Sequence, residues 1–186
     1  TVSGYSTSNP TEKNAGKYAN TISGTYTVTD PAGNDVTEQF AVKTQNGELV
    51  IGKRDVTLKS ADLSKPYDGT ALVNGETALE TEEGWVNGEG ADYSFTGSQT
   101  LVGSSENVFS YTLKENTKAD NYNISKSHGS LTVTNRKAKY EVTLVANSSV
   151  GNTYDGTEKS ATGVVTDKFT INGVEYTVSG YSTSNP

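Results

Sequence analysis

The feature that most constrains the fold of this chain is an exact internal repeat. Residues 1–10 read Thr-Val-Ser-Gly-Tyr-Ser-Thr-Ser-Asn-Pro, and residues 177–186 read the same ten letters. Identity over ten residues does not arise by chance, so the chain spans one period of 176 residues and the first ten residues of the next. A fixed period of this kind is typical of an array in which similar structural units follow one another.

A second, diverged repeat lies inside this period. Tyr67-Asp68-Gly69-Thr70 returns 87 residues later as Tyr154-Asp155-Gly156-Thr157. Further matches follow at similar shifts and pair Gly16 and Asn20 with Gly103 and Asn107, Phe40 with Tyr122, Gly47-x-Leu49-x-Ile51 with Gly129-x-Leu131-x-Val133, Arg54 with Arg136, Val56-Thr57-Leu58 with Val142-Thr143-Leu144, and Tyr93 with Tyr176.

These shifts divide the chain into two related repeats. Repeat B is complete and spans residues 55–136. Repeat A is present as two parts, because residues 137–186 carry its N-terminal part and residues 1–54 carry its C-terminal part. Each part alone would expose strand edges and half a core.

The division of repeat A predicts how copies assemble. We expect residues 137–186 of one copy to dock with residues 1–54 of the next by strand complementation, which rebuilds repeat A. Such a head-to-tail contact is heterologous and does not close on itself, so filaments are the expected product. The alternative is one longer covalent array.

Alternation of apolar and polar residues predicts strands, for example over residues 55–58 and 140–145. Asn-Gly pairs such as Asn87-Gly88 and Asn172-Gly173 favour tight hairpins, since both central positions of a type I′ turn need positive φ. The predicted fold is all-β: small antiparallel β-sandwich modules of Ig-like type in an elongated tandem array. β-Grasp-like modules are the alternative.

Composition and net charge limit the class of protein and its expected location. Hydrophobic residues make up 32% of the chain and its formal net charge is -7, which disfavours a nucleic-acid surface. No apolar run approaches the length that a membrane helix needs, so no membrane insertion is expected. A cysteine-free, acidic chain rich in Thr, Asn and Gly is typical of wall-attached proteins on the surface of Gram-positive bacteria. We therefore expect an extracellular location.

Few residues suggest a catalytic, metal-binding or ligand-binding site. The Tyr-Asp-Gly-Thr motif is interpreted as a structural turn in which Asp accepts backbone N–H bonds and Gly supplies positive φ. Sugar binding by its Tyr and Asp is the weaker interpretation, and Trp85 is a speculative glycan contact. A single His (His128) and no Cys disfavour a metal site, and no nucleophile–base pair is visible. We expect no cofactor and no enzymatic activity.

Two further candidate sites fit their patterns only in part. Lys59 and Asn135 lie in the first and last strands expected for repeat B, the positions at which many wall-attached β domains form an isopeptide bond. Repeat A has Ala146 and Lys53 at the matching positions, so the pair is not repeated. The acidic loop at residues 30–35 has oxygen ligands without calcium-loop spacing.

The sequence of repeat B resembles the MBG modules of bacterial surface adhesins. The resemblance rests on Lys65-Pro66-Tyr67-Asp68-Gly69-Thr70, Tyr93-x-Phe95-x-Gly97, Val102-Gly103 with Asn107, and Asn121-Tyr122-x-Ile124 with Gly129-x-Leu131-x-Val133. It implies an extracellular β module that serves as a stalk or adhesive segment. The predicted function is thus a structural stalk or fibre module; binding of host glycan or mucin is the alternative.

Overall fold

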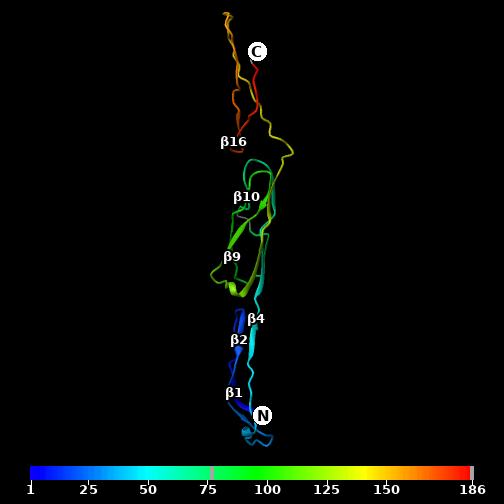
Figure 1. The fold of residues 1–186 in the computed structure, drawn as a ribbon, viewed down its shortest axis with the longest axis vertical. Helices are drawn as coiled ribbons and strands as arrows, with labels where there is room; N and C mark the ends of the chain where they lie inside the picture. Colours follow the sequence, from blue (N-terminus) through cyan, green and yellow to red (C-terminus); the bar gives the residue numbers. More distant parts are fainter. Residues whose placement is uncertain (76–77, 185–186) are drawn as a thin grey trace. The chain divides into compact units, whose positions relative to one another are not determined.

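The fold is described by a computed structural model, which covers residues 1–75 and 78–184 (Figure 1). Within these residues every regular element is a β-strand except two 3-10 turns, η1 (Thr37–Gln39) and η2 (Ala119–Asn121). The prediction of an all-β chain is therefore confirmed. The strands are β1 (Val2–Thr7), β2 (Gly16–Asn20), β3 (Ile22–Val28), β4 (Gly47–Ile51), β5 (Arg54–Lys59), β6 (Leu63–Pro66), β7 (Leu72–Val73), β8 (Thr81–Glu83), β9 (Ala91–Phe95), β10 (Ser98–Gln99), β11 (Gly103–Glu106), β12 (Phe109–Leu113), β13 (Tyr122–Ser127), β14 (Ser130–Thr134), β15 (Lys168–Ile171) and β16 (Val174–Thr177).

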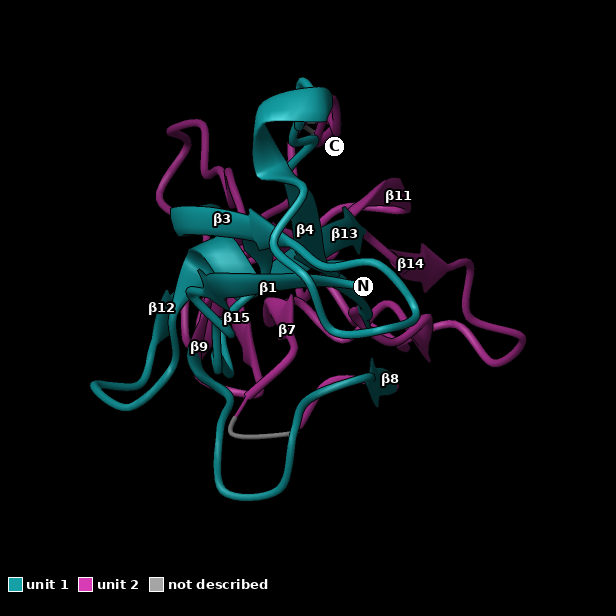
Figure 2. Cartoon of the chain, turned by 90° about the horizontal axis from the view of Figure 1, so that it is seen from below, with its two compact units in different colours: residues 1–58, 81–92, 111–127 teal, residues 59–80, 93–110, 128–186 magenta. Residues whose placement is uncertain are grey.

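The chain divides into two compact units (Figure 2). Unit 1 comprises residues 1–58, 81–92 and 111–127, and unit 2 comprises residues 59–80, 93–110 and 128–186. The repeat boundaries at residues 54 and 136 come from sequence similarity, and that division stays a prediction.

Unit 1 contains two antiparallel pairs, β1 with β3 and β2 with β4, and the three-stranded order β13-β5-β8. The β1–β3 register shifts between Ser3 and Tyr5, at Gly4, whose φ is 77°. A side chain at this bulge would overlap the carbonyl oxygen of Thr25, so glycine is required there.

The core of unit 1 follows the alternation seen in the sequence. Val56 and Leu58 are buried on one face of β5, while Asp55 and Thr57, which alternate with them, are exposed. Tyr122 is also buried, and Trp85 meets its ring edge-to-face with centroids 4.9 Å apart.

Unit 2 contains the sheet β11-β14-β6 together with the pair β7–β10 and the hairpin β15–β16. β14 is antiparallel to β11 and parallel to β6, with Leu131 opposite Leu63 and Thr134 opposite Pro66. Leu131 and Val133 point into the core, where Phe109 is also buried.

A buried polar network ties the core of unit 2 together. The Ser60 hydroxyl donates to the Asn107 carbonyl at 2.6 Å and accepts the Gly129 N–H at 3.0 Å. The Asn107 amide donates to Asn74 Oδ1 and to the Ala61 carbonyl. Because a buried polar group without a partner is costly, this network fixes the approach of residues 60–61 to the β11–β12 connection.

The two copies of the exact repeat adopt different structures. Residues 2–7 form β1, which pairs with β3, whereas residues 178–184 form no strand. Asn185 and Pro186, the last two residues of the second copy, lie outside the described residues. Identical letters therefore become a strand in one place and not in the other, which shows that pairing decides the outcome.

Candidate functional site

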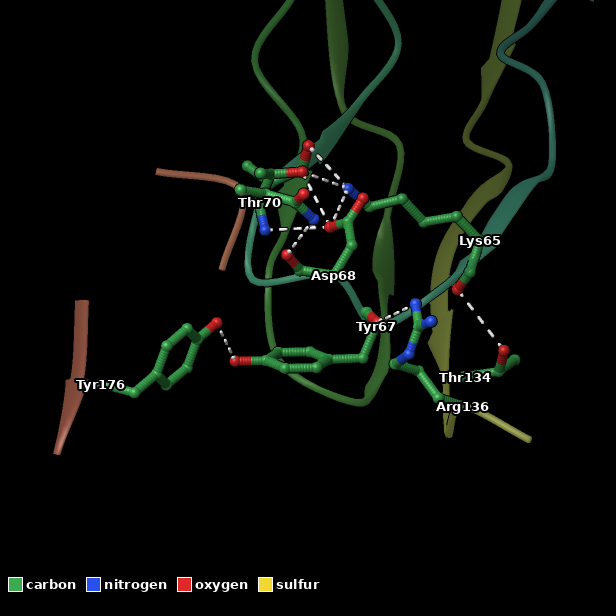
Figure 3. A network of polar contacts seen from close by, with 9 residues as sticks. Lys65, Tyr67, Asp68, Thr70, Thr134, Arg136 and Tyr176 are labelled. Carbon is green, nitrogen blue, oxygen red and sulfur yellow. Dashed lines mark hydrogen bonds and ion pairs between the residues drawn. The ribbon is translucent and has the colours of Figure 1, made fainter. Parts of the chain in front are cut away.

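The two Tyr-Asp-Gly-Thr turns of unit 2 are each a cluster of polar contacts. In the first turn, Asp68 Oδ1 accepts bonds from the Lys65 ammonium at 2.8 Å, the Thr70 N–H at 2.9 Å and the Thr70 hydroxyl at 2.8 Å (Figure 3). The Lys65 ammonium also donates to the Thr70 hydroxyl at 2.7 Å. The bonds from Lys65, followed by those from Thr70, lower the pKa of Asp68 to about 2.

The second turn builds the same cluster with a lysine from a different position. Asp155 Oδ1 accepts the Thr157 N–H at 3.0 Å and the Thr157 hydroxyl at 2.6 Å. The Lys159 ammonium binds Asp155 Oδ2 at 2.7 Å and the Thr157 hydroxyl at 2.8 Å. The bond from Lys159, followed by those from Thr157, lowers the pKa of Asp155 to about 2.

Lys65 lies two residues before Tyr67, the first residue of its motif, whereas Lys159 lies two residues after Thr157, the last residue of its motif. Matching the two repeats by position therefore does not pair the two lysines, and their contacts with Asp and Thr are visible only in the structure. The turn and its ion pair are common to both motifs although the cation is not aligned.

The first turn is packed against the β15–β16 hairpin within unit 2. The hydroxyls of Tyr67 and Tyr176 lie 2.9 Å apart, and the Asn172 amide donates to the Asp68 carbonyl at 3.1 Å. A side chain at Gly69 would overlap the Tyr176 hydroxyl, so this approach requires glycine as well as its positive φ of 84°. The neighbouring Tyr67 hydroxyl, followed by desolvation, raises the pKa of Tyr176 to about 12.

Arg136 holds the other side of Tyr67. Its Nη1 donates to the Tyr67 carbonyl at 3.3 Å, and its guanidinium lies 4.1 Å from the centre of the Tyr140 ring. Tyr67, Val102, Arg136, Phe169 and Tyr176 all line one cavity of about 440 Å³ in unit 2, which we call the unit 2 cavity.

The second turn lacks comparable packing. Tyr154 is 94% exposed, and a side chain built at Gly156 would meet no atom within 4 Å among the described residues. The two turns thus share their internal bonds and differ in what covers their tyrosine.

A cavity of about 330 Å³ in unit 1, which we call the unit 1 cavity, is lined in part by repeat counterparts of the unit 2 cavity. Ala15 and Arg54 line the first, while Val102 and Arg136, which the repeat shifts match to them, line the second. Val86, beside the Asn87-Gly88 turn, lines the unit 1 cavity much as Ile171, beside Asn172-Gly173, lines the unit 2 cavity.

Trp85 lies next to this cavity through its neighbour Val86 and its contact with Tyr122. The Tyr122 hydroxyl donates to Glu89 at 2.6 Å and accepts the Val86 N–H at 3.2 Å. Trp85 is half-buried, and its contact with a core tyrosine is that of a packing residue. Its role as a glycan contact stays a prediction.

The remaining candidates are engaged in local contacts. His128 Nδ1 lies 3.1 Å from Glu106, and its ring meets Phe109 edge-to-face. The Lys59 ammonium pairs with Glu80 at 2.7 Å. Asp30 accepts the N–H groups of Ala32 and Asn34, which closes the acidic loop on itself.

Residues 1–75 and 78–184 contain no group of three or more His, Cys, Asp or Glu side chains placed to hold a metal ion. Neither does any helix in this part of the chain have the length and apolar character to cross a bilayer. No protein-family model matches the chain, and comparison with curated proteins and with solved structures returned no match.

Proposed function

We propose that this chain is a structural stalk module of a bacterial surface adhesin, in which successive copies join head-to-tail with a period of 176 residues. In this proposal residues 137–186 of one period and residues 1–54 of the next together form repeat A as a β-sandwich module like repeat B. The location is extracellular and the partner is a neighbouring copy. The module carries out no reaction, so its fold and its contacts with neighbours constitute its function.

One observation carries the proposal: two apolar positions that are buried in repeat B are exposed at the matching places of repeat A. Val56 is 1% exposed and its counterpart Val142 is 40% exposed. Tyr122 is 4% exposed and its counterpart Phe40 is 57% exposed. Val142 and Phe40 belong to different parts of repeat A, so each part presents apolar side chains that the complete repeat would bury.

The strand pattern supports the same proposal. Residues 140–145 alternate as residues 55–58 do, yet form no strand. Residues 178–184 carry the sequence of β1 without its conformation. Both segments have the side chains of strands. In a covalent array residues 178–183 would be β1 of the next period, and residues 11–54, which include its partner β3, would follow them.

Hydrogen exchange on a chain of two covalently joined periods tests the proposal. In that chain, residues 137–186 of the first period are followed by residues 11–54 of the second, so one repeat A is complete. We expect the amides of residues 140–145 in the first period and 40–42 in the second to exchange at least tenfold more slowly than in the single chain.

Residues 1–54 at the start of the two-period chain act as an internal control at concentrations too low for separate chains to associate, because they then have no preceding copy and their amides should exchange as in the single chain. Equal exchange rates for residues 40–42 in both periods would overturn the proposal.

A further inference from the structure

We propose that the Tyr154-Asp155-Gly156-Thr157 turn forms the joint between repeat A and the repeat B that follows it, by closing the unit 1 cavity of the next copy. The occupant is thus a second copy of this chain, either covalently joined or separate. The inference rests on the proposed completion of repeat A and adds where consecutive modules touch.

The joint between repeat B and the following part of repeat A is visible in unit 2. Tyr67 and Arg136 come from repeat B, while Asn172 and Tyr176 come from repeat A. The contact therefore consists of a tyrosine turn and a terminal arginine from one module and an Asn-Gly hairpin from the next.

The other joint has several of the same parts in the sequence. Repeat A ends with Arg54, as repeat B ends with Arg136, and its own turn carries Tyr154. The next module offers the Asn87-Gly88 turn in place of Asn172-Gly173, while Tyr93, the sequence counterpart of Tyr176, packs against Phe109 in unit 2 and does not line the unit 1 cavity. The tyrosine turn, the arginine and the Asn-Gly turn thus recur, but Tyr154 must come from the preceding copy.

The spacing along the chain agrees. Tyr67 and Asn172 are separated by 105 residues, and Asn87 of the following period lies 109 residues after Tyr154. The four additional residues fit a repeat A that is slightly longer than repeat B, so the period brings the second turn to the same kind of hairpin.

The structure around the unit 1 cavity provides space and a donor for this turn. Arg54 lines the cavity, is exposed, and donates through Nε to the Gly84 carbonyl. Arg136 holds the Tyr67 carbonyl through Nη1, and Arg54 is placed to hold the Tyr154 carbonyl in the same way. The open space beside Gly156 corresponds to the space beside Gly69 that Tyr176 fills.

Disulfide trapping in the two-period chain tests the joint. The natural sequence has no cysteine, so the two that are introduced have no competing partners. We would place Tyr154→Cys in the first period and Val86→Cys in the second, and measure the oxidised fraction by intact mass after alkylation. Tyr67→Cys with Ile171→Cys, two residues that line the unit 2 cavity, sets the reference rate.

The matched control replaces Tyr154→Cys by Val150→Cys, four residues earlier and 87% exposed. We expect the Tyr154–Val86 pair to oxidise at a rate similar to the reference pair and at least tenfold faster than the Val150–Val86 pair. Tyr154 is itself exposed in the single chain, so its replacement leaves each module able to fold.

The outcomes separate this inference from the proposed function. If residues 40–42 of the second period are protected but the Tyr154 pair oxidises no faster than the Val150 pair, repeat A is completed and the joint is wrong. If neither protection nor rapid oxidation is seen, both proposals are overturned.

Discussion

The Lys65 and Lys159 ammonium groups reach the same carboxylate–hydroxyl pair from opposite ends of the motif. Each Asp accepts the N–H of the Thr two residues later, which closes a local turn, and the lysine adds a charge to a carboxylate that the backbone already orients. The lysine can therefore stand at different sequence positions in different repeats, as long as its Nζ reaches the turn.

The Lys65 ammonium should set the titration of Asp68. Since the pKa of Asp68 is lowered to about 2 from an ordinary value of 3.8, the stability that this shift supplies is present above pH 3.8 and is lost as the pH falls through about 2. In Lys65→Met we expect the carboxyl carbon of Asp68, followed by NMR, to titrate at higher pH, closer to 3.8.

Lys159→Met is the matched control. It should raise the pKa of Asp155 and leave that of Asp68 unchanged, because each lysine bonds its own turn. An Asp68 titration curve that does not move in Lys65→Met would show that Thr70 alone holds the low pKa.

At the scale of elements, the same alternation of apolar and polar residues forms a strand at one place in the chain and no strand at another. Val56 and Leu58 alternate with polar residues and are buried in β5, whereas Val142 belongs to the same pattern and lies in a segment without a strand. Alternation therefore predicted which residues would face a core, and it located β5, but it could not say whether a partner strand would be present.

Alanine substitutions should separate these two outcomes. Val56→Ala removes buried methyl groups and leaves a cavity, so it should lower the free energy of unfolding by about 2 kcal/mol. Val142→Ala in the single chain should change it by less than about 0.5 kcal/mol, because that side chain is exposed. Urea unfolding followed by circular dichroism measures both.

The same Val142→Ala change in the first period of the two-period chain should cost nearly as much as Val56→Ala, since the completed repeat would bury the side chain. A loss that stays near zero there would count against the burial of Val142 in repeat A.

The candidate site was partly predictable from sequence. The Tyr-Asp-Gly-Thr repeat and its turn residues were visible as letters, and Asp68 and Asp155 do accept backbone N–H bonds as expected. The Tyr67–Tyr176 pair was not predictable, because a contact across 109 residues depends on how strands pair and leaves no local pattern. The requirement for glycine at position 69, where a side chain would overlap the Tyr176 hydroxyl, was not predictable for the same reason.

At the scale of the whole molecule, the sequence predicts association. The exposed Val142 and Phe40 belong to two parts of one repeat, and neither side chain is covered in the single chain. Burial of such surfaces between copies releases water from apolar side chains and stabilises a head-to-tail contact.

Static light scattering of the single chain should show this association. We expect the weight-average mass to rise steadily above the 19.7 kDa of one chain as concentration increases, without a plateau at a dimer, because the proposed contact is heterologous. Phe40→Ser, which makes one exposed apolar position polar, should shift this rise to higher concentration, and Val150→Ser, at an exposed position outside the repeat matches, should not. A constant mass of one chain at every concentration would mean that separate copies do not assemble without a covalent link.

The parallel pairing of β6 with β14 has a mechanical consequence. β6 lies near the start of repeat B and β14 lies at its end, and the two run in the same direction with Leu63 opposite Leu131. Tension applied through the ends of the repeat would pull these strands in opposite senses along their length, so their hydrogen bonds would be loaded together in shear and would not open one at a time. Resistance to pulling is set by the rate of forced unfolding, and shear loading slows that rate. A chain built from such repeats would bear load along its axis before any module opened.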